Sequence, residues 1–347
     1  MKESDFFSAR PFAAADAELL QRAASWKADK SEFSDLNVSR LAAITALHGI
    51  EFATALVHER ALRAPANARF MKRARSARPT PQRREDLPDL IGVVPGAFHR
   101  EHRNTGADGA RIFRIARDLG CEAETIPVAS FGSLEINAQE IARWLQSRRH
   151  RRIVLVSLSK GGSDVKRALA LPGASQDFAH VRAWVSFSGI VQGTALIAWL
   201  RARPFRWWGV RLLLRLRGHP TRTLGELRRG PNTPLAGWPA VPPKLRIIHL
   251  CGVPLRRHLQ HEWAPRAYDR LAPLGPNDGG GILLGDLSRL PGIVVPVWGA
   301  DHYLDPSWDI MPLLRNVVLE GAGSDDPLHA NQSAVAPISA PAAKSTA

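Results

Sequence analysis

A serine stands at residue 159, where an apolar segment meets a run of small residues. Residues 153–163 read Ile-Val-Leu-Val-Ser-Leu-Ser-Lys-Gly-Gly-Ser. A serine in a sharp strand-to-helix turn presents its hydroxyl for nucleophilic attack, and such a turn accepts only small neighbours. Gly161 fits the pattern Gly-x-Ser-x-Gly, whereas Ser157 replaces its first glycine. The stretch therefore predicts a nucleophile elbow with Ser159 as the nucleophile.

A carboxylate and an imidazole follow this serine along the chain. Asp278 lies in the polar loop Gly-Pro-Asn-Asp-Gly-Gly, and His302 comes just after the apolar run 293–297. Serine becomes a useful nucleophile when a base takes its proton and a carboxylate orients that base. The chain order Ser, Asp, His is one in which such groups meet at the carboxyl edge of a parallel sheet. We expect Ser159, Asp278 and His302 to form a catalytic triad.

Other residues of the same types are weaker candidates for these roles. Asp286 falls inside a predicted helix, and Asp301 adjoins the histidine too closely in sequence to face its ring easily. Ser186 and Ser188 end another apolar run, but they lack glycines at the elbow positions. They remain alternatives to the carboxylate and to the nucleophile.

Acyl transfer also needs N–H donors for the developing oxyanion, and the loss of one donor costs about 3–4 kcal/mol. The Lys160 N–H stands where a helix after the elbow would begin. A second donor is expected from the loop Pro95-Gly96-Ala97-Phe98, which follows the apolar run 90–94. We favour the N–H of Ala97, with that of Phe98 as the alternative.

From residue 87 onward, short apolar runs alternate with amphipathic segments. The expected strands are 90–94, 123–128, 153–158, 181–187, 245–250 and 293–298, and the expected helices include 110–119, 134–147 and 160–171. This alternation predicts an α/β fold with a mostly parallel sheet flanked by helices.

The segment from about 189 to 243 interrupts the alternation and is interpreted as a helical cap. It holds Trp199, Trp207, Trp208 and Trp238, the leucines Leu196, Leu200, Leu212, Leu213, Leu214 and Leu216, and the arginines Arg201, Arg203, Arg206, Arg211, Arg215 and Arg217. The tryptophans and leucines are expected to line or cover an acyl pocket. The arginines either face water or bind an anionic head group.

The remaining segments complete the predicted organisation. They are an N-terminal helical extension over 1–65, an exposed basic linker over 66–86, the α/β domain over 87–321 with its cap, and a disordered tail over 322–347. The linker is basic and contains proline, and the tail is rich in Ala, Ser and Pro without periodicity.

Residues 87–320 resemble α/β-hydrolases of the serine esterase and lipase kind. The resemblance is carried by Val-Pro-Gly at 94–96, the elbow 157–161, Ser-Phe-Ser-Gly at 186–189, Pro-Asn-Asp-Gly at 276–279 and Asp-His at 301–302. It implies a hydrolase fold, a serine triad, an acyl-enzyme intermediate and no cofactor. The chain departs from the family at Ser157, at Pro95, where many lipases have histidine, and in the helices expected before residue 87.

Composition limits the other classes of function. The chain has 347 residues, 47 Lys and Arg against 32 Asp and Glu, and a net charge of +15. This charge favours anionic partners, but no recognition motif accompanies it, so we do not expect nucleic acid as a partner. Cys121 and Cys251 make neither a disulfide framework nor a zinc-site spacing. With no export signal and no apolar run of about 18–20 residues, a soluble cytoplasmic protein is expected.

The sequence therefore favours an enzyme that cleaves a small-molecule or lipid carboxylic ester. An acyltransferase would use the same triad and is the first alternative. The second alternative is a hydrolase-fold protein without turnover that binds anionic membrane surfaces. The basic linker and the Trp- and Arg-rich cap favour such peripheral contact, because they resemble an interfacial amphipathic element.

Overall fold

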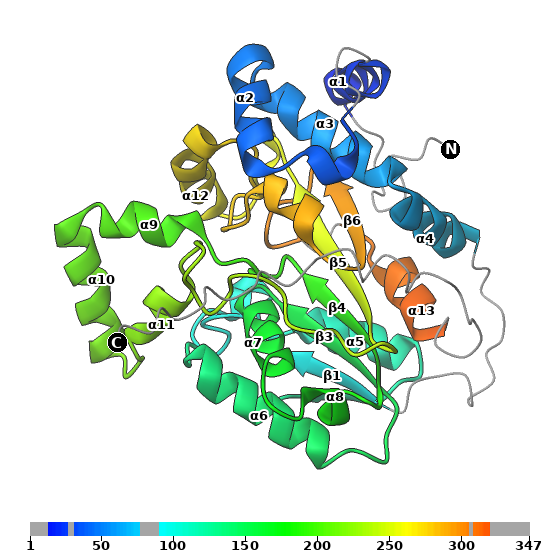
Figure 1. Cartoon of the computed structure of the whole chain (residues 1–347), viewed down its shortest axis with the longest axis vertical. Helices are drawn as coiled ribbons and strands as arrows, with labels where there is room; N and C mark the ends of the chain where they lie inside the picture. The colour runs from blue at the N-terminus through cyan, green and yellow to red at the C-terminus, as the bar shows by residue number, and fades with distance from the viewer. Residues whose placement is uncertain (1–12, 27–30, 77–89, 305–307, 320–347) are drawn as a thin grey trace, which may run out of the picture.

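A six-stranded parallel sheet forms the centre of the computed structural model (Figure 1). The structure describes residues 13–26, 31–76, 90–304 and 308–319. The strands are β1 (Leu90–Val94), β2 (Ala123–Thr125), β3 (Ile153–Leu158), β4 (Val181–Phe187), β5 (Arg246–Val253) and β6 (Ile293–Trp298). Their order is β2-β1-β3-β4-β5-β6, and every neighbouring pair is parallel. The predicted parallel α/β fold class is confirmed.

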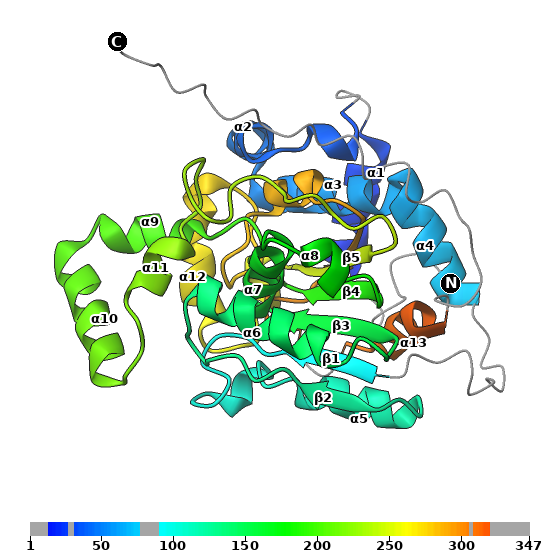
Figure 2. The ribbon, with the colours of Figure 1, turned by 60° about the horizontal axis from the view of Figure 1, so that its bottom comes forward.

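Helices cover both faces of the sheet, which explains why its central strands are apolar throughout. On one face lie α5 (Ala110–Asp118) and α13 (Met311–Leu319), packed against residues such as Val93 and Val156. On the other lie α6 (Leu134–Gln146), α7 (Lys160–Leu169) and α8 (Ala174–Asp177), packed against Leu155 and Trp184. Figure 2 shows α6, α7 and α8 together on one side of β1 and β3, with α5 on the other.

The N-terminal helices expected from the sequence are present and share the core of the sheet. They are α1 (Ala14–Ser25), α2 (Val38–His48) and α3 (Ile50–Arg63), and together they cover β5 and β6. Trp298 at the end of β6 is buried among them, and its indole N–H donates to Asp16 of α1 over 3.3 Å. These helices therefore cover β6, the edge strand that leads to His302.

The basic linker expected over 66–86 is corrected in its first half, where α4 (Pro65–Ser76) forms. Phe70 and Met71 of this helix pack in the core of the sheet, and Ala74 is buried as well, so the three form an apolar face within a basic sequence. Asn67 also accepts a 2.9 Å hydrogen bond from the Val294 N–H of β6. The second half of the linker, and the tail expected over 322–347, lie outside the described residues.

The segment expected to be a cap forms three helices. They are α9 (Ala195–Arg201), α10 (Pro204–Leu216) and α11 (Arg222–Glu226), and in Figures 1 and 2 the α9–α10 hairpin stands out from the body. Leu214 and Leu224 pack with Phe131 and Leu134 of the main domain in a small apolar core. Trp208, Leu212, Leu213 and Leu216, expected to cover an acyl pocket, are instead exposed on the outer side of α10.

The remaining elements are short. They are α12 (Ala264–Leu271) and the 3-10 helices η2 (Phe33–Asp35), η4 (Arg103–Thr105), η5 (Arg256–His258), η6 (Ala272–Leu274) and η7 (Leu284–Arg289). Within the described ranges, no helix has both the length and the apolar character needed to span a membrane.

Candidate active site

Ser159 occupies the turn between β3 and α7 with an unusual backbone conformation. Its φ of 49° and ψ of −116° lie outside the regions that non-glycine residues normally adopt, as at a nucleophile elbow. The strain is held by the neighbouring strand, because the Ser159 N–H donates to Phe187 O over 2.9 Å. A Cβ on Gly161 would lie 2.6 Å from Val94 O, so only glycine fits between the elbow and β1.

Ser157, which replaces the first glycine of the usual motif, is buried and hydrogen-bonded. Its hydroxyl accepts a 2.8 Å hydrogen bond from the indole N–H of Trp184 in β4. A buried hydroxyl with a partner avoids the desolvation cost of an unpaired one. The departure from the motif is therefore accommodated by a side chain of the adjacent strand.

The three residues expected to form the triad lie in one chain of hydrogen bonds. Ser159 Oγ is 2.9 Å from His302 Nε2, and His302 Nδ1 is 2.5 Å from Asp278 Oδ2. The imidazole stands between the hydroxyl and the carboxylate, which is the arrangement that moves a serine proton to a base. The structure therefore brings together residues that are far apart in the sequence.

The loop after η6 fixes the Asp278 carboxylate. Its Oδ1 accepts hydrogen bonds of 2.9 Å from the N–H groups of Gly280, Gly281 and Ile282, while its backbone carbonyl accepts from His302 N–H over 2.8 Å. Burial by itself raises the pKa of Asp278, but the His302 charge and these hydrogen bonds outweigh it and lower the pKa. The carboxylate therefore remains ionised beside the imidazole.

The imidazole of His302 is also buried, and its environment favours the protonated form. Burial lowers its pKa, but the charge of Asp278 and the hydrogen bond to it have the larger combined effect and raise the pKa above 6.5. The ring packs against Gly280, where an added Cβ would lie 2.0 Å from His302 Cγ. Position and basicity of the ring are both set by the Asp278 loop.

The candidate oxyanion donors lie beside the elbow. Their hydrogen bonds distinguish the N–H of Ala97 from that of Phe98 as the second donor. The Phe98 N–H donates to Ser130 O over 3.0 Å, so this group is already engaged. Among the described residues, no backbone acceptor is bonded to the N–H of Ala97 or of Lys160. A Cβ on Gly96 would lie 3.5 Å from Ser159 Cβ, which places the loop next to the nucleophile. The geometry favours Ala97 over Phe98.

The competing carboxylates have structural partners. Asp286 is in η7 and forms a bidentate ion pair with Arg229, with N–O distances of 2.7 and 2.9 Å. Asp301 accepts hydrogen bonds from the N–H groups of Gln260, His261 and Tyr303. Neither carboxylate is bonded to the His302 ring in the part of the chain that the structure describes.

The competing serines do not contact a base. Ser186 and Ser188 are buried, and their hydroxyls have no hydrogen-bond partner among the described residues. A Cβ on Gly189 would lie 2.1 Å from Ser186 Oγ, so this hydroxyl is enclosed by backbone. Of the serines that end strands β3 and β4, Ser159 is the one that meets the imidazole.

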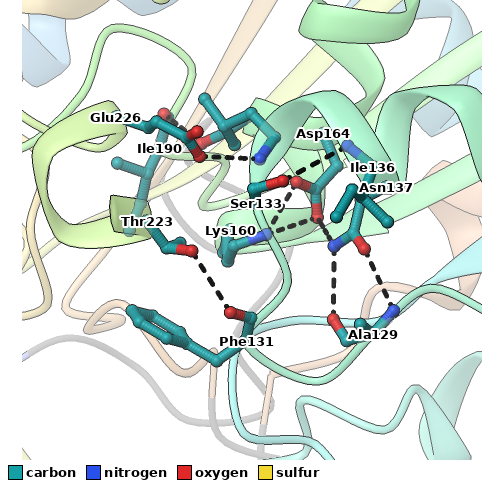
Figure 3. A network of polar contacts seen from close by, with 12 residues as sticks. Ala129, Phe131, Ser133, Ile136, Asn137, Lys160, Asp164, Ile190, Thr223 and Glu226 are labelled. Atoms are coloured by element: carbon teal, nitrogen blue, oxygen red, sulfur yellow. Dashed lines mark hydrogen bonds and ion pairs between the residues drawn. The ribbon is translucent and has the colours of Figure 1, made fainter. Parts of the chain in front are cut away.

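A buried polar network behind the elbow was not anticipated from the sequence (Figure 3). The Lys160 ammonium lies 2.7 and 2.9 Å from the two carboxylate oxygens of Asp164, and both side chains are about 1% exposed. The Asn137 amide donates to Asp164 over 3.0 Å and also bonds both backbone groups of Ala129. The sequence did contain one indication of this ion pair, because Lys160 and Asp164 are four residues apart on one helix.

The same region connects the main domain with the cap. Glu226 at the end of α11 accepts a 2.8 Å hydrogen bond from Leu134 N–H at the start of α6. Thr223 donates to Phe131 O over 3.3 Å, and Figure 3 places these contacts close to the Lys160–Asp164 pair. The cap is thus anchored to the segment that leads from the Ser130 loop into α6.

Comparison with solved structures finds esterases and lipases of low sequence identity. A metagenomic carboxyl esterase aligns over 71% of this chain and 77% of its own, with 20% identity and a TM-score of 0.48. The mature form of a Bacillus licheniformis lipase aligns over 65% of this chain and 89% of its own, with 19% identity and a TM-score of 0.47. No protein-family model and no curated protein matches the chain.

Proposed function

We propose that this protein is a serine hydrolase that cleaves a carboxylic ester through an acyl-enzyme intermediate. The observation that carries the proposal is the hydrogen-bonded sequence Ser159 Oγ, His302 Nε2, His302 Nδ1 and Asp278 Oδ2, with distances of 2.9 and 2.5 Å. Its support includes the backbone conformation of Ser159, which is that of a nucleophile elbow. No bound group is needed for this chemistry.

In the proposed mechanism, Ser159 attacks the ester carbonyl while His302 takes the hydroxyl proton. The N–H groups of Ala97 and Lys160 stabilise the oxyanion of the tetrahedral intermediate. His302 then gives its proton to the departing alcohol, which leaves an acyl group on Ser159. Water, activated by the same imidazole, releases the acid and restores the hydroxyl. Asp278 holds the tautomer of the ring and stabilises the imidazolium.

Two observations favour turnover over a fold without chemistry. The ring of His302 is already oriented by Asp278 and within hydrogen-bond distance of Ser159. The N–H groups expected to bind the oxyanion have no described backbone acceptor, although they lie beside a serine whose backbone is strained. A scaffold without activity has no need for such strain.

Labelling with a fluorophosphonate tests the nucleophile directly. The intact protein should be labelled on the peptide that contains Ser159, and the Ser159→Ala variant should not react and should lose on the order of 10⁶ in kcat. Ser157→Ala, two residues away on β3, is the matched control and should still be labelled. Labelling of the Ser159→Ala variant at another serine, with hydrolysis retained, would overturn the assignment.

The substrate class needs a separate measurement. A series of p-nitrophenyl esters with increasing acyl length should give saturable hydrolysis with a preferred length. Product analysis in the presence of an alcohol acceptor separates hydrolysis from acyl transfer, because transfer yields a new ester at the expense of free acid. No hydrolysis of any ester by a protein that reacts with fluorophosphonate would contradict the ester assignment and leave the nucleophile in place.

A further inference from the structure

Residues of α9 in the cap and of α12 in the main domain line an open cleft of about 720 Å³. Figure 1 shows where these two helices lie. The two helices pack against each other, and residues of both line the cleft. Three arginines contribute to its wall, namely Arg203, Arg266 and Arg270. We call this space the α9–α12 cleft.

Three guanidinium groups lie close to the indole ring of Trp199 in this cleft. The guanidinium carbon of Arg203 lies 3.9 Å from the centroid of the indole ring, that of Arg270 lies 4.3 Å away, and that of Arg206 lies 5.4 Å away. Cation–π contact places these groups over the ring but leaves their charges in full. The indole therefore acts as a platform that holds several positive charges together.

The cleft contains little negative charge to balance these arginines. Asp269 lines it, but both of its oxygens are bonded to Arg256, at 2.7 and 3.1 Å. Within the described ranges, no carboxylate forms an ion pair with Arg203, Arg206, Arg266 or Arg270. The pKa of Arg270 is lowered by burial and by repulsion from the three other arginines. An anion with several oxygen acceptors would relieve this repulsion.

A second feature adjoins the cleft on α10. Phe205, Trp208, Leu212 and Leu216 recur at helical spacing and are 94%, 62%, 58% and 76% exposed. The opposite side of the helix packs on the main domain through Leu214. The exposed apolar face is thus turned away from the protein, on the hairpin that stands out in both views (Figures 1 and 2).

Arginines border this apolar face. Arg206 lies on one flank of α10, and Arg211 and Arg215 lie on the other, as helical spacing requires. An exposed apolar stripe between flanking cations is typical of helices that lie in the plane of an anionic membrane. A second copy of this chain is a poorer occupant, because its own arginines would repel these. Charge complementarity therefore selects an anionic lipid surface.

We propose that the outer face of α10 inserts into the surface of a bilayer and that the α9–α12 cleft binds the phosphate group of an anionic phospholipid there. The apolar side chains of α10 insert at the boundary between head groups and acyl chains, and the guanidinium groups of the cleft bind the phosphate. This proposal is independent of the proposed hydrolysis, because it requires no reaction at Ser159.

Vesicle sedimentation with the Ser159→Ala protein tests the proposal without turnover. Binding should be strong to vesicles of phosphatidylcholine with one third phosphatidylglycerol, weak to phosphatidylcholine alone, and weaker at high salt. Arg266→Gln/Arg270→Gln should lower the affinity by about 30-fold, as expected for two charges near an anionic surface. Phe205→Gln/Leu216→Gln should lower it as well, since both remove inserted apolar surface.

A matched control removes the same charge elsewhere. Arg114 and Arg117 are exposed on α5, on the opposite side of the sheet from α6 and α7. Arg114→Gln/Arg117→Gln should bind phosphatidylglycerol vesicles as the parent does, and circular dichroism should show that every variant is folded. If this control lost as much vesicle affinity as Arg266→Gln/Arg270→Gln, net charge rather than the cleft would drive binding, and the assignment would be overturned.

Two further measurements separate the other occupants. If inorganic phosphate raises the Tm of the parent but not of Arg266→Gln/Arg270→Gln, and vesicles do not bind, the anion is a free one and the lipid proposal is wrong. If sedimentation velocity reveals a dimer that Phe205→Gln/Leu216→Gln abolishes, and vesicles do not bind, the face belongs to a second copy. Undiminished vesicle binding by the arginine variant also overturns the proposal.

Discussion

The indole N–H of Trp184 donates a 2.8 Å hydrogen bond to the hydroxyl of Ser157, two residues before the nucleophile elbow. Both side chains are buried between the sheet and the helices that cover it. The bond joins β3 to β4 close to the point where Ser159 N–H also bonds to Phe187 of β4. Hydrogen bonds between β3 and β4 therefore fix the backbone on which the elbow stands. The serine that replaces the usual glycine at position 157 has a hydrogen-bond partner for its hydroxyl.

Ser157→Ala should reduce stability more than activity. The substitution leaves the Trp184 N–H buried without an acceptor, which lowers the free energy of unfolding by about 1–3 kcal/mol. Urea denaturation measures this change, and a cycle with Trp184→Phe gives the coupling of the pair. The value of kcat should stay near that of the parent, because the Ser157 hydroxyl does not contact His302. A loss of kcat as large as that of Ser159→Ala would contradict the assignment of the nucleophile.

Much of the α/β fold followed from local sequence patterns, because its strands are short apolar runs and the helices between them are amphipathic. The strands 90–94, 153–158, 181–187 and 293–298 were predicted with the bounds that the structure has. Helix α4 was missed, because seven basic residues between 66 and 86 obscured the apolar spacing of Phe70, Met71 and Ala74. A charged helix that packs through a narrow stripe resembles a linker in composition.

The site was predictable in its residue types but not in its hydrogen bonds. The order of Ser159, Asp278 and His302 pointed to residues that the structure brings together. The choice between Ala97 and Phe98 depended on Ser130 O, a backbone contact that no local pattern encodes. The exposure of Leu212, Leu213 and Leu216 depends in the same way on which side of α10 packs, a tertiary property.

Replacement of Asp278 should impair catalysis, whereas replacement of Asp286 should impair stability. Asp278→Asn should lower kcat by about 10⁴, because the amide no longer fixes the productive tautomer of His302. Asp286→Asn should leave kcat almost unchanged and reduce the free energy of unfolding, since Arg229 loses its bidentate partner. Steady-state kinetics and urea denaturation on both variants check this. A severe loss of kcat in the Asp286 variant would reverse the assignment.

Activity should fall on the acid side with a midpoint above pH 6.5. His302 must be neutral to accept the Ser159 proton, and Asp278 raises the pKa of the ring above its usual 6.5. As pH falls through that pKa, the imidazolium forms and kcat/KM decreases. In Asp278→Asn the carboxylate charge is lost, so the midpoint should move down. A profile of kcat/KM against pH measures both, and an upward shift in the variant would contradict this account.

The buried ion pair behind the elbow should respond differently to single and double replacement. Lys160→Met leaves the Asp164 carboxylate buried with its main partner gone, which costs about 3–5 kcal/mol. Lys160→Met/Asp164→Leu removes both charges and should be more stable than the single variant. Urea denaturation provides the comparison. The backbone N–H at position 160 is unchanged in both, so variants that fold should retain kcat, and a folded double variant without activity would implicate the pair in catalysis.

Gly280→Ala should reduce the rate while leaving the fold intact. The new Cβ would lie 2.0 Å from His302 Cγ and 2.3 Å from its Cβ, so the imidazole must leave the position in which it bonds Ser159 Oγ. A displacement of about 1 Å in a reacting group costs about 10²-fold, so kcat and the rate of fluorophosphonate labelling should fall by at least that factor.

Gly225→Ala in α11 is the control for this substitution, because an added Cβ there meets no atom within 4 Å. It should keep the parental kcat, and alanine in place of a helical glycine should if anything raise the Tm. Circular dichroism verifies that both variants fold. Because Gly280 does not itself carry chemistry, its effect reports the position of the imidazole. A Gly280→Ala protein with unchanged kcat would mean that catalysis does not depend on the contact between His302 and Ser159.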